Sequence, residues 1–363
     1  MTLALIEKFR DPELCRGLLA RIEAEAGDGF RFMEVCGTHT VVIFQSGLHT
    51  LLPERIVHVS GPGCPVCVTH ESEVNAFLDL AEKPGVIIAT FGDLMRVPGR
   101  KGRSLKQAQA AGARVEIVYS AAESLRLAAE NPNDTVVFLG VGFETTAPTV
   151  AATLMTAKAQ GVRNLKVLSF HKVVPPALAA LLSDPAVNID GFILPGHVSS
   201  VIGLAPYRFI AGQCGKPAAI AGFEPLDILE ALLFLLRCKA QGKPEVANLY
   251  RRVVADAGNP KARAVLETVF RPADALWRGI GCIPGSGLEL SEAYADFDAK
   301  QAFGIVIEDS PPLPGCKCGE VLKGMIRPDE CPLFKKACTP ASPVGPCMVS
   351  TEGSCAAYFK YGI

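Results

Sequence analysis

Residues 31–40 read RFMEVCGTHT, and this short stretch contains the pattern that decides the fold. A β-forming run over 31–35 leads into a Cys-Gly-Thr turn and then into a helical pattern. The order of strand, turn and helix recurs along the chain, with further runs at 55–60, 86–90, 114–119, 135–141, 165–170, 191–194 and 218–221. Such alternation predicts an α/β protein with parallel sheets and crossover helices.

The spacing of these runs also predicts how the chain divides into domains. Four units followed by four more predict two similar open parallel-sheet, Rossmann-like domains over 30–122 and 123–241, the second ending in a long helix over 226–241. Beyond residue 241 the sequence is helical and charged over 245–257 and 262–270, and then becomes rich in glycine. We expect 242–363 to form a mainly helical and irregular iron–sulfur domain, joined by an amphipathic helix within 1–29.

The unusual residues lie just past the carboxyl ends of the predicted strands. MEVCGTHT and LGVGFETTAP end the first strand of each half, SGPGCPVC and SFHKVVPP follow the second, and ATFGD and LPGHVS follow the third. Open parallel sheets bind ligands in the crevice outside these strand ends. If the halves face each other, one cleft can receive Cys36, His39, Cys64, Cys67, Asp93, Glu144, His171 and His197.

Composition limits the classes of function. The 363 residues are 49% hydrophobic and 20% charged, with a net charge of −1 and no charged block, which argues against nucleic acid or a membrane surface as a partner. The N-terminus lacks the apolar core of a signal peptide, and no 18 apolar residues run together, so we expect a cytoplasmic protein. In that reducing compartment, thirteen cysteines indicate metal ligation or redox chemistry.

The tail from Cys316 to Cys355 holds six of the thirteen cysteines, interleaved with prolines and glycines that forbid long helices or strands. Disulfides, zinc or an iron–sulfur cluster could hold it together. Structural zinc sites usually use close cysteine pairs, and the tail offers only Cys316 and Cys318. Intervals of fourteen, six and sixteen residues favour a cluster, with zinc as the alternative; the ligands would be Cys316, Cys331, Cys338 and Cys355.

Two tail cysteines remain, Cys318 and Cys347. Because Cys318 lies one residue beyond a proposed ligand, the pair could form a dithiol that takes electrons from the cluster. The alternative interpretation is two spare buried thiols.

Cys64 and Cys67 form a C-x-x-C motif at a predicted helix N-terminus, where backbone amides favour the thiolate. This pair could form a disulfide or bind a metal, and the alternative is a pair of inert buried thiols. Cys36 and His39 suit a soft metal ion or an activated nucleophile, although Thr38 and His39 could equally form a capping turn.

Asp93, Glu144, His171 and His197 could orient a thiolate or shuttle protons, and Asp93 or Glu144 could instead cap helices. The glycines of residues 140–145 lack the third glycine of a dinucleotide fingerprint, and there is no phosphate-binding loop with lysine, so nucleotide binding is not favoured.

Taken in order, MEVCGTHT, SGPGCPVCVT, ATFGD, GVGFETTAP, LPGHVS, the WRGIG segment at 277–281 and the tail cysteines resemble the HypD family of maturation factors for NiFe-hydrogenases. The resemblance spans residue 30 to the end. It implies a scaffold that, with a HypC-type partner, holds an iron ion while two cyanides and one carbon monoxide are added. Cyanide would come from HypE with HypF, and the hydrogenase large subunit would receive the iron through HypC.

The resemblance also implies roles for residues. Cys36 would be the iron-site cysteine, with Cys64 and Cys67 as the neighbouring pair, able to ligate the iron or relay electrons. Apart from the resemblance, the residue pattern makes Asp93, Glu144 and His197 candidate cofactor-binding residues. Cys318 and Cys347 would be the dithiol beside a 4Fe-4S cluster like that of ferredoxin:thioredoxin reductase. Two other functions stay open: a cluster-dependent thiol–disulfide oxidoreductase acting on another protein, and an interaction protein whose cluster is only structural.

Overall fold

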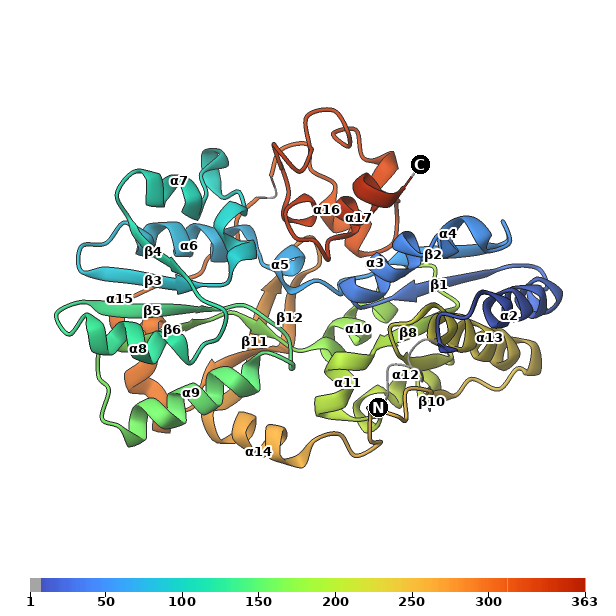
Figure 1. Cartoon of the computed structure of the whole chain (residues 1–363), viewed down its shortest axis with the longest axis horizontal. Coiled ribbons are helices and arrows are strands. Elements are labelled where there is room, and N and C mark those ends of the chain that lie inside the picture. The colour runs from blue at the N-terminus through green and yellow to red at the C-terminus, as the bar shows by residue number, and fades with distance from the viewer. Residues whose placement is uncertain (1–7, 312, 363) are drawn as a thin grey trace.

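The computed structural model describes residues 8–311 and 313–362. Two parallel sheets lie side by side, and the C-terminal tail lies above their junction (Figure 1). The first sheet has the order β10 (Val246–Asn248), β9 (Ala218–Ala221), β8 (Gly191–Pro195), β1 (Phe30–Glu34) and β2 (Ile56–Ser60). The second has the order β4 (Arg114–Ile117), β3 (Val86–Thr90), β5 (Thr135–Gly140) and β6 (Leu165–Ser169). All strand pairs in both sheets are parallel, so the predicted α/β class is confirmed.

The eight predicted strands are all present, but they are not grouped as four followed by four. β1 and β2 pair in one sheet with β8 and β9, while β3 and β4 pair in the other with β5 and β6. The expected boundaries at 30–122 and 123–241 therefore do not separate the two sheets. The sequence pattern identifies which runs are buried strands, but it carries no information about which strand lies beside which.

The region after residue 241 also differs from the expectation. The predicted helix over 245–257 is wrong, because β10 extends the first sheet there, whereas the helix expected over 262–270 is present as α14 (Pro260–Val269). β11 (Phe270–Trp277) and β12 (Gly281–Leu290) form an antiparallel sheet with the short β7 (His171–Lys172). These strands were not predicted from the sequence, because they contain glycine and proline, which are usually depleted in strands.

The tail itself is irregular, as expected. It contains only short helical segments, which are α16 (Cys318–Leu322), η5 (Pro328–Glu330), η6 (Pro346–Met348) and α17 (Ser354–Tyr361). Its buried residues, including Cys318, Cys347 and Met348, belong to the same apolar cluster as Cys67 and Phe77 of the α/β part. The described residues of the tail therefore share the core of the parallel sheets.

The N-terminal helix predicted within 1–29 is present as α2 (Pro12–Glu25), capped by Asp11, while residues 1–7 lie outside the described residues. We expected it to pack with the third region, and this was wrong. It packs against α13 (Pro225–Gln241), the long helix predicted over 226–241. Ion pairs of Arg237 with Glu25 and of Arg10 with Glu224 reinforce this contact.

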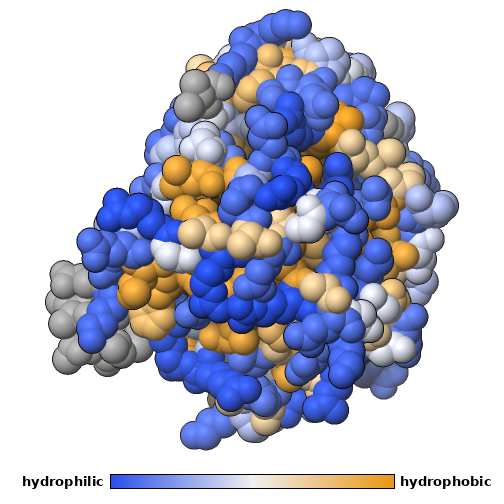
Figure 2. Space-filling view, turned by 90° about the vertical axis from the view of Figure 1, so that its right-hand side faces the viewer, coloured by the Kyte–Doolittle hydropathy of each residue, from blue (hydrophilic) through white to orange (hydrophobic). Residues whose placement is uncertain are grey.

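The face of the molecule on the side of α2 and α13 is mostly hydrophilic, and its apolar residues lie in separate small areas (Figure 2). Leu14 and Leu51 are the most exposed large aliphatic residues of α2 and of α4 (Leu48–Leu51), at 51% and 57%. Scattered exposed leucines of this kind are ordinary on a protein surface. Among the residues that the structure describes, no helix is both long and apolar enough to cross a membrane.

One fully buried ion pair links β7, in the antiparallel sheet, to the helix that follows the C-x-x-C motif. Lys172 Nζ donates to Glu73 Oε1 at 2.8 Å and to Oε2 at 3.0 Å, and both residues are at most 3% exposed. Glu73 belongs to the first turn of α6 (Glu71–Ala81), where its carboxylate also accepts from the His70 N–H at 2.8 Å. Removing one partner of such a pair leaves an uncompensated buried charge.

We expect Lys172→Met to lower the free energy of unfolding by about 3–5 kcal/mol, because Glu73 then lacks its counter-charge. Urea denaturation followed by circular dichroism measures the change. Lys323→Met is the matched control, since the Lys323–Asp184 pair is partly exposed and should be worth about 1 kcal/mol or less. Equal losses in the two variants would contradict the assigned role of the buried pair.

Candidate functional site

Cys36 lies at the carboxyl end of β1 and caps α3 (Gly37–Gln45). A carboxylate fixes this turn: Glu34 Oε2 accepts from the Cys36 N–H at 3.0 Å, and its Oε1 accepts from Thr40 Oγ1 at 2.5 Å. Glu34 is completely buried, so its position is set by these donors and by its surroundings. Glu34 was not among the predicted site residues, although its place two residues before Cys36 was a usable signal.

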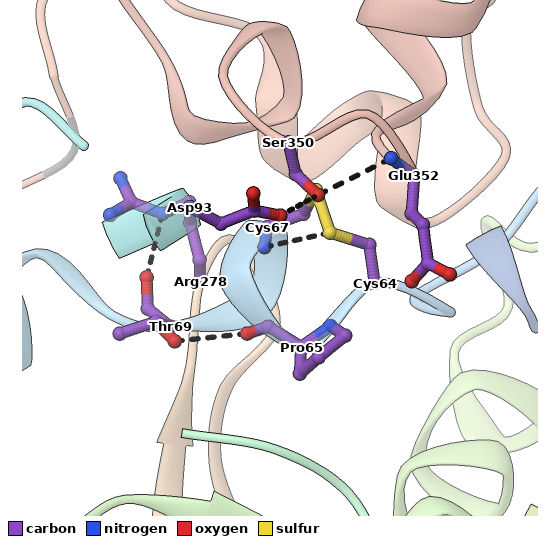
Figure 3. Close-up of a disulfide and its surroundings, with 8 residues drawn as sticks. All are labelled: Cys64, Pro65, Cys67, Thr69, Asp93, Arg278, Ser350 and Glu352. Atoms are coloured by element: carbon purple, nitrogen blue, oxygen red, sulfur yellow. Dashed lines mark hydrogen bonds between the residues drawn. A yellow bond between two sulfur atoms is a disulfide. The ribbon is translucent and has the colours of Figure 1, made fainter. Parts of the chain in front are cut away.

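Cys64 and Cys67 follow β2; Cys64 is the N-cap of the short helix α5 (Pro65–Val68), and Cys67 lies within it. They form a disulfide, and the Cys67 N–H donates to Cys64 Sγ at 3.2 Å (Figure 3). The motif lies directly against Cys36, because a Cβ at Gly63 would come within 2.1 Å of the Cys36 nitrogen. The Gly37 N–H also donates to the Gly63 carbonyl at 3.1 Å. Glycine is thus required at position 63 for the two motifs to meet.

A loop of the tail completes the junction. A Cβ at Gly37 would lie 2.4 Å from the Glu352 carbonyl oxygen, and Thr38 Oγ1 donates to Glu352 Oε1 at 2.9 Å. Ser350 Oγ donates to Asp93 Oδ2 at 3.1 Å, which places the Asp93 carboxylate beside the disulfide (Figure 3). Ser350 and Glu352 were missed, because nothing in the sequence connects this loop with residues more than 250 positions away.

Two histidines, His39 and His197, pack against Phe223 beside this junction. His39 is fully buried, donates from Nε2 to the Gly222 carbonyl at 2.8 Å, and has no hydrogen-bond partner for Nδ1 among the described residues. The Phe223 ring lies 4.8 Å from the His39 ring and 4.1 Å from the His197 ring, measured between centroids. Burial lowers the pKa of His197 and the carboxylate of Glu352 opposes this, so His197 belongs to the rim of the same site.

The surroundings of Cys36 do not favour the thiolate that an activated nucleophile needs, which was one of the roles expected for Cys36 and His39. Burial, together with the negative charges of Glu352 and Glu34, raises the pKa of Cys36 to about 12. Backbone amides of α3 oppose the shift, but they are outweighed. Without a bound cation, Cys36 is therefore a protonated thiol at neutral pH. A metal ion must displace this proton in order to bind.

Glu144 and His171 make their hydrogen bonds with their own surroundings, and their place in a shared cleft stays a prediction. Glu144 Oε1 accepts from the Val174 N–H at 2.9 Å at the start of α10 (Val174–Ser183), and burial raises its pKa to about 7. His171 lies in β7, where its Nδ1 contacts Ser169 Oγ at 3.0 Å, and burial lowers its pKa to about 3. Both residues follow strand ends of the second sheet, as Asp93 does.

The tail cysteines gather into one group of thiols. Cys316 contacts Cys318, Cys318 contacts Cys347, and Cys347 contacts Cys355. The Val344 N–H donates to Cys338 Sγ at 3.3 Å, and Cys331 packs against the same apolar cluster. Within residues 8–311 and 313–362, no three histidine, cysteine or acidic side chains are arranged as ligands of a metal ion. The thiol group contacts the C-x-x-C motif, because η6, which contains Cys347, packs on α5.

Fold and site together define a class of protein: two parallel sheets whose cysteine motifs meet beneath a cysteine-rich tail. A family model described as "HypD: Hydrogenase formation hypA family" matches residues 13–362. The chain is 45% identical to the hydrogenase maturation factor HypD of Rhodobacter capsulatus, over 98% of this chain and 97% of that protein. It is also 45% identical to HypD of Escherichia coli K12, with the same coverage of both chains. The chain belongs to the HypD family.

The raised pKa of Cys36 predicts slow alkylation in the metal-free protein. At pH 7 the thiolate is a very small fraction, so iodoacetamide should modify the exposed Cys282 at least roughly a thousandfold faster. The Cys36 rate should rise about tenfold per pH unit up to pH 9, and Glu352→Gln should increase it by removing a nearby negative charge. Mass spectrometry of tryptic peptides measures both rates. Similar rates for Cys36 and Cys282 at pH 7 would contradict the burial argument.

Proposed function

We propose that this chain is a maturation factor for NiFe-hydrogenases that holds an iron ion while cyanide and carbon monoxide ligands are attached. The relatives named above are hydrogenase maturation factors. The observation that carries the proposal is the meeting of Cys36, the Cys64–Cys67 pair and the tail loop at one junction. These three elements are distant in sequence, and their direct backbone contacts favour a role in one common reaction over three separate roles.

The iron is the cargo of this reaction, and thiolates suit it. Fe(II) with cyanide and carbon monoxide is a centre that prefers soft ligands, which Cys36 supplies, with Cys64 and Cys67 as further donors once their disulfide is reduced. Binding at Cys36 must release the thiol proton. Glu352 and the free Nδ1 acceptor of His39 are groups near this point that can receive a proton. Asp93 and His197 border the same junction.

The tail supplies donors of the type that an iron–sulfur cluster takes. A Cβ at Gly345 would come within 2.7 Å of both Cys316 Sγ and Cys318 Sγ, so the chain closes tightly around these thiols. This supports Cys316, Cys331, Cys338 and Cys355 as ligands of a 4Fe-4S cluster. Such a cluster would provide single electrons.

Cys318 and Cys347 would pass these electrons on. Opening the Cys64–Cys67 disulfide takes two electrons and two protons, which a Cys318/Cys347 dithiol can deliver while it becomes a disulfide itself. The packing of η6 on α5 supports this direct exchange. Cys318 and Cys347 are both buried, so an external oxidant would not compete easily.

We further propose a HypC-type partner that completes the iron site, cyanide delivery by HypE with HypF, and transfer of the iron to the hydrogenase large subunit through HypC. The thirteen cysteines suit the reducing cytoplasm, where this assembly would take place.

A second candidate is a thiol–disulfide oxidoreductase acting on a separate protein, which the Cys64–Cys67 disulfide favours. Infrared absorption separates the two functions. Bands of metal-bound cyanide and carbonyl in the protein purified with its partner select the scaffold. Turnover of an external disulfide without such bands selects the reductase.

The proposed cluster ligands can be tested one by one. Anaerobically purified protein should contain about four irons and four sulfides per chain, and alanine at Cys316, Cys331, Cys338 or Cys355 should abolish the visible absorption of the cluster. Cys318→Ala and Cys347→Ala should keep the cluster but slow reduction of the Cys64–Cys67 disulfide. Cys15, Cys214, Cys238 and Cys282 should be dispensable. Full cluster content in a ligand variant would remove that residue from the set.

Cys36→Ser should stop iron assembly most completely, because it replaces a soft ligand by a hard one of much higher pKa and similar size. The fold and the iron and sulfide of the tail should remain. Infrared spectroscopy of the variant, purified with its HypC-type partner, measures the cyanide and carbonyl bands. Bands at wild-type intensity would transfer the role of anchor to Cys64 and Cys67.

A further inference from the structure

Arg278, in the WRGIG segment between β11 and β12, is a buried cation that none of the proposed steps uses. It is 2% exposed. Its backbone N–H donates to the Val68 carbonyl at 3.0 Å, and its Nε donates to the Thr69 carbonyl at 2.8 Å. Both acceptors lie at the carboxyl end of α5, the helix of the C-x-x-C motif (Figure 3). One residue thus satisfies carbonyl groups at the end of this short helix.

The same turn touches the tail at its second cysteine. A Cβ at Gly279 would lie 2.0 Å from Gly319 Cα, and a Cβ at Gly319 would lie 2.6 Å from Gly279 Cα. Gly279 also has φ of +70°, a conformation that favours glycine. The residues before these glycines are Arg278 and Cys318, so the turn that holds α5 lies directly on the proposed dithiol.

The two terminal nitrogens of the Arg278 guanidinium differ in their partners among the described residues. Nη1 forms an ion pair with Glu71, whereas Nη2 is buried and has no hydrogen-bond partner among residues 8–311 and 313–362. Because Arg278 precedes Gly279, and Gly279 lies against Gly319, the residue after Cys318, this buried cation lies close to the cysteines of the tail.

We propose that Arg278 is a positioning residue that holds the C-x-x-C helix against the tail and sets the reduction potential of the tail's sulfur centre through its charge. This inference rests on the proposed cluster. It assigns a role to a residue outside all the cysteine motifs. The role has two parts, mechanical through Val68 and Thr69, and electrostatic through the guanidinium.

The electrostatic part makes a prediction with a definite sign. Reduction of a cluster adds one negative charge, which a nearby cation stabilises, so Arg278 should raise the potential. Glu71 partly cancels this cation, so removing its charge should raise the potential further. Loss of Arg278 and loss of Glu71 should therefore shift the potential in opposite directions. A purely structural role would move it in the same direction in both variants, or leave it unchanged.

The experiment is an anaerobic redox titration of the full-length, cluster-bearing protein, followed by electron paramagnetic resonance. Arg278→Met should shift the midpoint negatively, changing the oxidised-to-reduced ratio at a fixed potential on the order of tenfold. Arg278→Lys should restore most of the wild-type value because the charge remains, and Glu71→Gln should shift the midpoint positively. Arg252→Met is the control, since Arg252 pairs with Asp227, a carboxylate of α13. It should leave the midpoint unchanged.

Shifts of equal sign in Arg278→Met and Glu71→Gln, or no shift in either, would overturn the inference while leaving the proposed cluster intact. If Arg278→Met does not fold, the other two variants test the inference. A positive shift of the midpoint in Glu71→Gln and a near-normal midpoint in Arg278→Lys would support it, and any other result would overturn it. A wild-type protein free of iron and sulfide would contradict the proposed cofactor, and this inference with it.

Discussion

The close approach of three backbone segments is the constraint on which the site depends. Gly63 lies on Cys36, and Gly37 lies on Glu352, at distances that no side chain could fit. These contacts join the end of β1, the end of β2 and the tail, which are held in place by different parts of the fold. A shift of one segment would separate the cysteines, so the packing of the whole chain determines the geometry of the site.

Burial has opposite effects on the two kinds of cysteine in this arrangement. At Cys36 it stabilises the neutral thiol, so the residue is protected from stray oxidation and alkylation. Cys64 and Cys67 form a disulfide, and neither sulfur titrates in that form. The pair can therefore act as thiols only after reduction.

Buried charges around this junction orient its parts. The Lys172–Glu73 and Arg278–Glu71 pairs both involve the first turn of α6, which follows the C-x-x-C motif. Pairs of this kind contribute little net stability, since desolvation offsets their attraction, but a misplaced partner would be costly. They therefore fix the direction in which α5 and α6 leave the motif. The tail gains its position from this fixed framework, since Gly279 next to Arg278 supports Gly319.

The sequence by itself determined the parallel strands, the α/β class and the cysteine motifs, because each of these depends on residues close together in the chain. The eight strands lie within a few residues of the predicted runs, and Cys36 and Cys64 lie at strand ends as expected. Strand order, the hairpin of β11 and β12, and the partners of α2 were decided only by tertiary structure. The same holds for Glu352, Ser350 and Arg278, which carry no local signal. Glu144, His171 and Asp93 all follow strand ends of the second sheet, but only tertiary packing brings the Asp93 carboxylate to Ser350, because a strand end marks an edge of a sheet without fixing what lies against it.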